Sequence, residues 1–278
     1  MGNDVIQDFH GARIQHGPES DRIYLMDLGV SDTVELAPQL VELAKRFDYG
    51  KIFAKIRAKD AAPFLDARFS VEANAQRMCK GEEEVLFLGL FLDEARKHES
   101  LEAKYDEVLD IALSKQHGDG LAPADGIRLC TASDAPAMAQ LYDKVFDSYP
   151  FPIHDPQFIA ESMKEGTVYA AMENEGRFVA LASAECEFHQ DKLYAEMTDF
   201  ATLPSERGKG HASTLLSFLE GTIAARGIKT AYTIARAISP GMNITFAKSA
   251  YSYGGRLKNN TQIAGRIESM NVWYKSIV

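Results

Sequence analysis

One stretch constrains the fold of this chain more than any other: a strand-like apolar run, a basic glycine loop and an amphipathic helix follow each other without interruption. The apolar run covers residues 193–203, and the loop sequence RGKG occupies 207–210. Apolar residues then recur at helical spacing until Arg226 and Gly227, a cation and a C-cap glycine that end a helix. The first amides of a helix have no carbonyl partner, and glycines let an anion come close to them. The stretch therefore predicts a strand, a polyanion-binding loop and a helix.

Composition places the chain among soluble globular proteins and narrows its partners. The 278 residues are 46% hydrophobic and 25% charged, and the net charge of −10 argues against a nucleic-acid partner. Three widely spaced cysteines, Cys79, Cys130 and Cys186, favour a reducing compartment over disulfides or a zinc site. The start of the chain lacks the pattern of a signal peptide, and no apolar run is long enough to cross a bilayer. We expect a cytoplasmic protein with no metal and no membrane partner; its oligomeric state stays open, a dimer included.

A linker divides the chain. Residues 114–125 are rich in glycine and polar residues, so we expect an N-terminal α/β module over 1–120 and a second domain over 126–278. In the second domain the apolar patterns and turns predict the order β-α-α-β-β-β-loop-α-β-α-β-β. Its strands are expected at 126–131, 167–173, 177–188, 193–203, 229–235, 255–263 and 267–274, and its helices at 133–146, 155–164 and 239–251, besides the one after the glycine loop.

This element order resembles the GNAT acetyltransferases, and so does the run from Arg207 to Ala212, which fits the pattern R-x-x-G-x-G/A. The resemblance covers 126–278, slightly over half of the chain. It implies a mixed α/β fold with an acetyl-CoA site in the splayed gap between the fourth and fifth strands. The implied cofactor-binding residues are Phe200 and Thr202, beside the pantetheine, the loop residues Arg207, Gly208, Lys209, Gly210, His211 and Ala212, and Asn243 and Phe246 on the helix after the fifth strand.

The first 120 residues show a β-α-β-α-β pattern. Its elements are expected at 23–28, 36–47, 51–56, 61–68 and 85–92. The string KIFAKIRAKDAAPFLDARFSVEA resembles the strand, helix and turn in the second half of a GNAT domain, but no R-x-x-G-x-G loop precedes it. We interpret the segment as a degenerate half-GNAT module that packs against or shapes the substrate site; an unrelated α/β domain is the alternative.

A narrower resemblance, to the β-lysine N-acetyltransferases, is carried by two long strings: SYPFPIHDP at 148–156 and YTIARAISPGMNITFAKSAYSYGGRLKNNTQIAGRIESMNVWYKSI from Tyr232 on. It implies acetylation of the side-chain amine of β-lysine (3,6-diaminohexanoate) to the compatible solute Nε-acetyl-β-lysine. Two alternatives stay open. One is an acetyltransferase for another small amine, such as a polyamine or diamine, and the other is a catalytically weak acyl-CoA-binding regulatory protein.

Acyl transfer to an amine requires the amine in its neutral form. A lysine-like amine has a pKa of about 10.4, so near pH 7 only about one molecule in 2,500 is neutral. Our candidate base is Glu196, eleven residues before Arg207 on the strand that leads to the loop, where several GNAT enzymes have a catalytic glutamate. Its alternative role is to bind the substrate ammonium. Asp199 is the rival base; by strict alternation it faces away from Glu196, unless the β-bulge that GNAT enzymes carry in this strand turns it inward.

Two further features concern the same site. Glu185 and Glu187 share one face of the neighbouring strand, where they form either an acidic wall for a diamine or a solvated surface. Phe246 stands where many GNAT enzymes have a tyrosine as general acid for the leaving thiolate. A thiol with a pKa of about 8.5 leaves without full protonation. Tyr251 or Tyr253 are candidate substitutes, although such aromatic residues more often belong to a core.

The predicted substrate-binding residues are Tyr149, Phe151, Asp155, Arg236, Glu268 and Asn271. Tyr149 and Phe151 are expected to line the aliphatic stem of the substrate, and Asp155 to meet an ammonium. The alternative for this loop is packing alone. Arg236 is expected to receive the substrate carboxylate, while the last two residues either face the same cleft or serve strand pairing.

Overall fold

The computed structural model describes residues 4–116 and 126–278. The N-terminal half contains the strands β1 (Val5–Phe9), β2 (Ala12–Gly17), β3 (Arg22–Asp27), β4 (Lys51–Arg57), β5 (Ser70–Cys79) and β6 (Glu83–Phe91), the helices α1 (Thr33–Arg46), α2 (Ala62–Asp66) and α3 (Glu102–Leu113), and the 3-10 turns η1 (Ala58–Asp60) and η2 (Glu94–Lys97). The five elements expected here are all present. The prediction missed β1, β2 and β5.

The C-terminal half follows the predicted element order. Its strands are β7 (Ile127–Leu129), β8 (Thr167–Asn174), β9 (Arg177–Glu187), β10 (Tyr194–Thr202), β11 (Thr230–Arg236), β12 (Ser252–Ile263) and β13 (Arg266–Ser276), and its helices are α4 (Ala135–Val145), α5 (Pro156–Lys164), α6 (His211–Ala224) and α7 (Pro240–Lys248), with 3-10 turns η3 (Ala132–Asp134) and η4 (Pro204–Glu206). The mixed α/β fold class is confirmed. The predicted linker falls largely on residues 117–125, outside those described, so the domain boundary there stays a prediction.

The two halves repeat one topology. All described strands form a single sheet in the order β1-β2-β3-β4-β6-β5-β12-β13-β11-β10-β9-β8-β7. Read outward from the central pair, each half has the same succession: β5-β6-β4-β3-β2-β1 corresponds to β12-β13-β11-β10-β9-β8. The directions also agree, since β3–β4 and β10–β11 are the parallel pairs of their halves and each parallel pair is crossed over by a helix, α1 or α6. This repeat supports a GNAT-like module in the N-terminal half, and it extends beyond the predicted second half, because β1 and β2 also have counterparts in β8 and β9.

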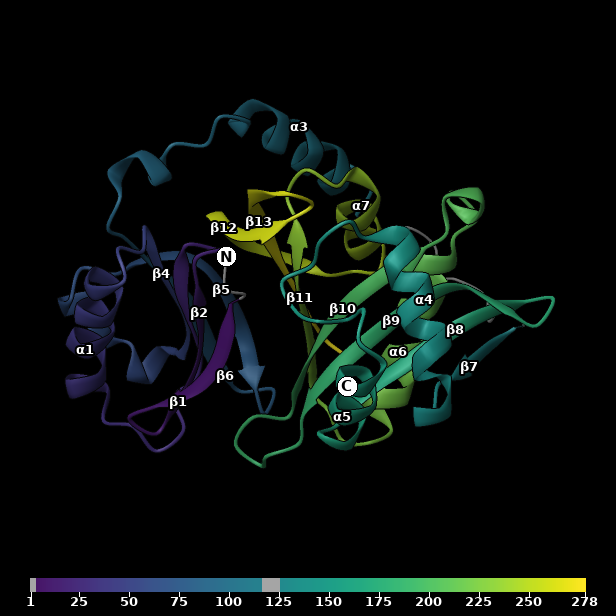
Figure 1. The fold of residues 1–278 in the computed structure, drawn as a ribbon, viewed down its shortest axis with the longest axis horizontal. Coiled ribbons are helices and arrows are strands. Elements are labelled where there is room, and N and C mark those ends of the chain that lie inside the picture. Colours follow the sequence, from purple (N-terminus) through teal and green to yellow (C-terminus); the bar gives the residue numbers. More distant parts are fainter. Residues whose placement is uncertain (1–3, 117–125) are drawn as a thin grey trace.

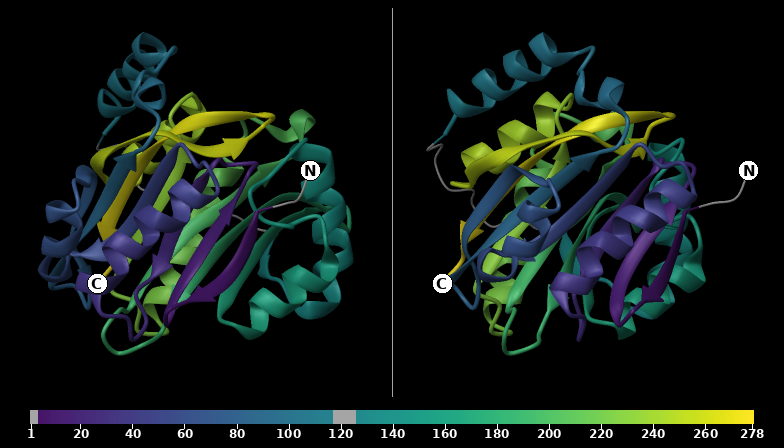
Figure 2. Two further views of the ribbon diagram at one scale, coloured as in Figure 1. Left: turned by 60° about the vertical axis from the view of Figure 1, so that its left-hand side comes forward. Right: turned by 90° about the vertical axis from the view of Figure 1, so that its left-hand side faces the viewer.

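The sheet bends so that the two halves face each other (Figure 1). α1 and α2 cover the outer face of the N-terminal half, and α1 lies in front in the right-hand view of Figure 2. In the C-terminal half α6 and α7 cover one face, where α3 packs against α7, and α4 and α5 cover the other. A further core lies between the halves, where Phe53 and Phe87 meet Tyr232 and Val272. None of the helices in 4–116 and 126–278 is long and apolar enough to cross a membrane.

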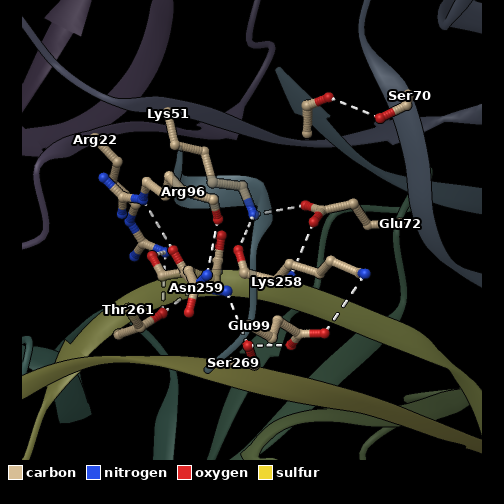
Figure 3. Close-up of polar contacts among 12 residues, drawn as sticks. Arg22, Lys51, Ser70, Glu72, Arg96, Glu99, Lys258, Asn259, Thr261 and Ser269 are labelled. Atoms are coloured by element: carbon tan, nitrogen blue, oxygen red, sulfur yellow. Dashed lines mark hydrogen bonds and ion pairs between the residues drawn. The ribbon is translucent and has the colours of Figure 1, made fainter. Parts of the chain in front are cut away.

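A buried polar network joins the halves (Figure 3). The Lys51 ammonium lies 2.7 Å from the Glu72 carboxylate and donates to the Lys258 carbonyl at 2.7 Å, while the Lys258 N–H donates to Glu72 at 2.9 Å. Burial lowers the pKa of Lys51 to about 8, against the attraction of Glu72. Nearby, the Arg96 guanidinium donates to the Asn259 carbonyl at 3.0 Å and the Asn259 amide donates back to the Arg96 carbonyl at 2.7 Å. Because removal of one charge would leave its partner buried alone, this network locks the relative position of the halves.

Two glycines make the central strand pair sterically feasible. Gly255 of β12 pairs with Ala73 of β5 at a φ of +138°, where a Cβ would lie 2.7 Å from the Ala73 Cα. At the preceding Gly254 a Cβ would clash with the Asn74 carbonyl. The neighbouring atoms are backbone and cannot move aside, so β5 and β12 approach closely only because both residues lack a side chain.

We predict that Gly255→Ala separates these strands and lowers the free energy of unfolding by at least about 1–3 kcal/mol, the usual range for one strained residue. Gly221→Ala is the matched control: Gly221 lies in α6 with open space around its Cα. Alanine there is expected to stabilise the helix by about 0.5–1 kcal/mol. Urea denaturation of both variants measures the difference. An unfolding free energy of Gly255→Ala equal to that of the wild type would contradict this role of the central pair.

Candidate active site

A cavity of about 1230 Å³ lies between the halves, at the point where β10 and β11 part. The two parallel strands pair from Tyr194–Thr230 to Glu196–Tyr232, and the ladder ends there within the described residues. Beyond this pair the cavity wall continues along β10 to the glycine loop, and on the other side it reaches β3 and β4 of the N-terminal half. The fourth and fifth strands of the C-terminal domain thus diverge as expected, and the gap between them opens into one continuous chamber.

The glycine loop has the geometry of an anion site. Gly208 and Gly210 have φ of +81° and +84°, and a Cβ on either would meet nothing within 4 Å. Positive φ therefore explains the glycines, and the space in front of them is open. The first backbone bond of α6 runs from the Thr214 N–H to the Gly210 carbonyl at 3.1 Å, so the amides of 211–213 have no partner within the helix. An anion with several oxygens can accept from these amides.

The predicted cofactor-binding residues mostly share this wall. Those that line the cavity are Phe200, Thr202, Arg207, Gly208, Gly210, His211, Ala212 and Phe246. Phe246 is fully buried at the base, with its ring edge-on to Phe200 at 5.7 Å. Lys209 is turned toward Glu206, 2.8 Å away, and contributes its charge from outside the cavity lining.

Asn243 has a different position from the one predicted. Its side chain is fully buried on the inner side of α7, where the amide donates to the carbonyls of Arg236 and Ser239 at 3.0 and 2.7 Å. Its carbonyl oxygen accepts from Asn271 and Trp273, each at 2.9 Å. The four bonds use the whole hydrogen-bonding capacity of the side chain. Asn243 and Asn271 therefore fasten α7 to β11 and β13, and neither belongs to the cavity lining.

Three carboxylates meet where the strands part. Glu196 accepts a 2.7 Å hydrogen bond from the Tyr232 hydroxyl, and Glu185 lies directly opposite Glu196 in the β9–β10 register. Asp199 joins them because β10 contains a bulge between Thr198 and Ala201, with Asp199 at a φ of +54°. The predicted bulge is thus present, and both candidate bases line the cavity. In the described ranges no three histidine, cysteine or acidic side chains gather closely enough to hold one metal ion.

Asp199 is the more constrained of the two candidate bases. It is buried, and it accepts hydrogen bonds from the Ser183 and Tyr149 hydroxyls, both at 2.7 Å. Among the described residues Glu196 has a single such donor, Tyr232, and it is only partly buried. Both oxygens of Asp199 are thus engaged, which leaves Glu196 the freer carboxylate to accept a proton.

The environment favours the protonated forms of these acids. Burial raises the pKa of Glu196 and of Asp199. Glu185 lines the cavity with an exposed side chain, and its enclosure in the chamber together with the charges of Glu196 and Asp199 raises its pKa above the ordinary value. Between the two interpretations of Glu185, the structure supports the acidic wall. A carboxylate whose pKa is raised toward neutrality is suited to accept a proton near pH 7.

The predicted substrate residues separate into two groups. Tyr149, Phe151 and Arg236 line the cavity, but the Arg236 guanidinium is held at 2.7 and 2.8 Å by the buried carboxylate of Glu268. Glu268 itself is fully buried and serves as that partner. Asp155 caps α5 by accepting from the Gln157 N–H at 2.8 Å, outside the cavity lining.

Sequence reasoning missed two residues of the cavity that the structure brings to Glu196. Tyr232 faces it from β11, and Lys55 of β4 donates to the Tyr232 hydroxyl at 2.9 Å. The only signal for Lys55 was the string KIFAKIR, in which a lysine alternates with apolar residues on a strand. Which partner it meets depends on how the two halves pack, and no local pattern encodes that.

An anion loop and a cluster of proton-accepting carboxylates in one chamber define an acyl-transfer enzyme, and the comparisons agree. Residues 136–239 match the Acetyltransferase (GNAT) family. The beta-lysine N(6)-acetyltransferase of Methanococcus maripaludis is 33% identical over 276 residues, 97% of this chain and 98% of the relative. The protein of the same name from Methanosarcina mazei is 40% identical over 151 residues, 54% and 55% of the two chains. N-acetyltransferase YodP of Bacillus subtilis is 31% identical over 242 residues, 86% and 87%.

The chain belongs to the GNAT family of acetyltransferases. The similarity to the Methanococcus maripaludis protein extends along nearly the whole chain, so it includes the N-terminal half as well as the catalytic domain. The protein is accordingly an N-acetyltransferase.

Proposed function

We propose that this enzyme transfers the acetyl group of acetyl-CoA to the side-chain amine of β-lysine, giving Nε-acetyl-β-lysine. The observation that carries the proposal is the single cavity that joins an anion loop to the carboxylates Glu185, Glu196 and Asp199. Acidic side chains suit a substrate with two ammonium groups. Support for β-lysine in particular comes from the two relatives that bear that substrate in their names.

The residues of the loop fit a coenzyme A diphosphate. The space in front of Gly208 and Gly210 is open, the first amides of α6 point toward it, and Arg207 adds a full positive charge. The unpaired edge of β10 at Phe200 and Thr202 offers backbone groups for the amides of pantetheine. When bound, the cofactor supplies an acetyl group activated as a thioester.

The carboxylates carry out the proton chemistry. Substrate ammonium enters as a cation, and Glu196 accepts one of its protons, directly or through water, so that the amine becomes a nucleophile. The Tyr232 hydroxyl holds Glu196 in position, and the Ser183 and Tyr149 hydroxyls hold Asp199 in the same chamber. As the C–N bond forms and the C–S bond breaks, the nitrogen gives up a second proton to water, and the departing thiolate takes up one proton from water.

The leaving thiolate has no tyrosine at the usual position, since Phe246 occupies it. Tyr251 packs against Phe246 at 5.1 Å and is fully buried behind it, and neither Tyr251 nor Tyr253 lines the cavity. The thiol, with an ordinary pKa of about 8.5, can leave as a thiolate and take its proton from water.

Steady-state kinetics on a panel of amines tests the function. We expect kcat/KM for β-lysine to exceed that for lysine and for spermidine by at least about 10-fold, equivalent to about 1.4 kcal/mol of transition-state stabilisation. A higher value for spermidine would favour a polyamine as substrate, and a higher value for lysine would favour the α-amino acid; either would refute β-lysine.

A charge reversal tests the loop. We predict that Gly210→Glu weakens coenzyme A binding by about 100-fold, about 2.7 kcal/mol, because the new carboxylate occupies the space in front of the α6 amides. Gly227→Glu is the matched control: Gly227 lies past the other end of α6, at a φ of +93° and also with nothing within 4 Å. It carries the same charge and a comparable backbone strain. Isothermal titration calorimetry that finds equal affinity for the two variants would exclude this loop as the diphosphate site.

A base variant tests the proton chemistry. We predict that Glu196→Gln lowers kcat at pH 7 by about 100-fold, within the usual range for a general base. The loss should shrink toward pH 10, because an amine with a pKa of about 10.4 then loses its proton to water. In the wild type, kcat should fall as the pH drops through the raised pKa of Glu196, and the variant should lack this step. Glu173→Gln, the same change on β8 at a residue outside the cavity lining, is the control. An unaltered pH profile in Glu196→Gln would show that another group acts as the base.

A further inference from the structure

Lys55 brings a positive charge from the N-terminal half into the acidic chamber. It lies on β4 and lines the cavity, and its ammonium donates to the Tyr232 hydroxyl at 2.9 Å. The rings of Tyr194 and Tyr232 flank it, each with its centroid 5.2 Å from Nζ. An ammonium has three donors, and within the described residues the Tyr232 hydroxyl is the one oxygen that receives a hydrogen bond from Lys55.

Two other cations of the cavity are already paired with carboxylates. Arg236 is held by Glu268 at 2.7 Å, and Lys192 lies between Asp27 and Glu187. For Lys55 the described residues place no carboxylate within 4.0 Å. Burial disfavours its charge, but the surrounding tyrosines and Glu196 raise its pKa well above the ordinary value, so it stays an ammonium at neutral pH. A half-buried cation with free donors and no acid beside it is suited to an anion that comes from outside.

Arg22, another cation of the cavity lining, is less available. It lies on β3 and is only 4% exposed, and it donates to the Asn260 carbonyl at 2.6 Å and to the Thr261 hydroxyl at 3.0 Å. Those bonds belong to the network between the halves (Figure 3). Arg22 thus has a structural task, whereas Lys55 faces the chamber.

We propose that Lys55 binds the carboxylate of the amino-acid substrate, so that the N-terminal half selects amino acids over simple diamines. This inference rests on the proposed acetylation of a diamino acid. The site then has two ends, an acidic one that takes the ammonium and a cationic one that takes the carboxylate.

The distances allow both ends to be filled by one molecule. Lys55 Nζ and Glu196 Oε2 both bond to the Tyr232 hydroxyl, at 2.9 and 2.7 Å, so they lie at most about 5.6 Å apart. A contact of about 2.8 Å at each end extends the span that a ligand can bridge to about 11 Å. In β-lysine, six bonds of about 1.5 Å separate the side-chain nitrogen from the carboxyl carbon, or roughly 7 Å when extended.

The test compares substrates that differ only by the carboxylate: β-lysine with pentane-1,4-diamine, and lysine with pentane-1,5-diamine. We expect Lys55→Met to raise KM for β-lysine by about 10- to 100-fold, the loss of one charge-assisted contact, and to leave KM for pentane-1,4-diamine nearly unchanged. Lys55→Arg should restore most of the preference. Lys59→Met is the control, because Lys59 lies on η1, outside the cavity lining, and pairs with Glu83 at 2.8 Å.

The alternative role of Lys55 is to tune Glu196 through Tyr232. In that case Lys55→Met lowers kcat for the amino acid and its diamine alike and shifts the pH profile of both, and the carboxylate subsite is refuted. Lys55→Gln and calorimetric binding of each ligand give the same comparison should the Met variant misfold. If the wild type acetylates β-lysine poorly but lysine well, β-lysine fails as substrate while the second pair still decides the role of Lys55.

Discussion

The hydrogen bond between Tyr232 and Glu196 lies at the point where the parallel strands β10 and β11 begin to separate. It closes the last pair of the β10–β11 ladder, so it marks the point beyond which the parallel strands separate and a cofactor can enter. On one side of it lies the open wall that leads to the glycine loop. On the other side Lys55 donates to the same hydroxyl, so one oxygen connects the N-terminal half to the carboxylate proposed as the base. The end of the parallel ladder, the proposed base and a contact between the halves thus meet at a single cross-strand pair.

The repeat of the fold shows how one topology supports two tasks. Counted from the first pair of each parallel ladder, Tyr24 and Phe53 occupy the places of Glu196 and Tyr232. Their rings pack together at a tilt of 30°, with centroids 4.7 Å apart. The N-terminal half therefore has a closed aromatic pair where the C-terminal half has its acid. The helix starts differ in the same sense: Asp32 caps α1 by accepting from the Val34 N–H at 2.9 Å, and a carboxylate at that point excludes a phosphate. The N-terminal module thus has the same strand and helix arrangement as the C-terminal half, but neither an acid at the Glu196 position nor an open anion site at the start of its crossover helix.

The C-terminal half could be predicted well from sequence because its signals are local. Helical spacing after the glycine loop and the turn at 174–176 depend on neighbours within a few residues. The bulge near Asp199 was expected only from the resemblance to the GNAT enzymes, since strict alternation placed Asp199 on the other face. The strands that were missed lack such signals. β1 is an exposed edge strand, and the inward residues of β5 include the small Ala73 and Ala75, which carry little pattern. Contacts between different helices and strands of the site could not be predicted either. The pairing of Glu268 with Arg236 and the full set of hydrogen bonds of Asn243 both follow from tertiary packing.

The carboxylate cluster also makes the folding stability of the ligand-free enzyme depend on pH. An acid whose pKa is raised on folding binds more protons in the native than in the unfolded chain, so its effect is to lower stability as the pH rises from the unfolded pKa to the folded one. For Glu185 that window runs from about 4.3 to about 8. Solvent in the cavity screens the effect. The chamber sets the carboxylates Glu185, Glu196 and Asp199 of the C-terminal half against the Lys55 ammonium of the N-terminal half. In the subsite proposed for Lys55, the carboxylate of an amino acid would meet that cation, whereas a simple diamine would bring it only a like charge. The placement of Lys55 therefore favours an amino acid over a diamine.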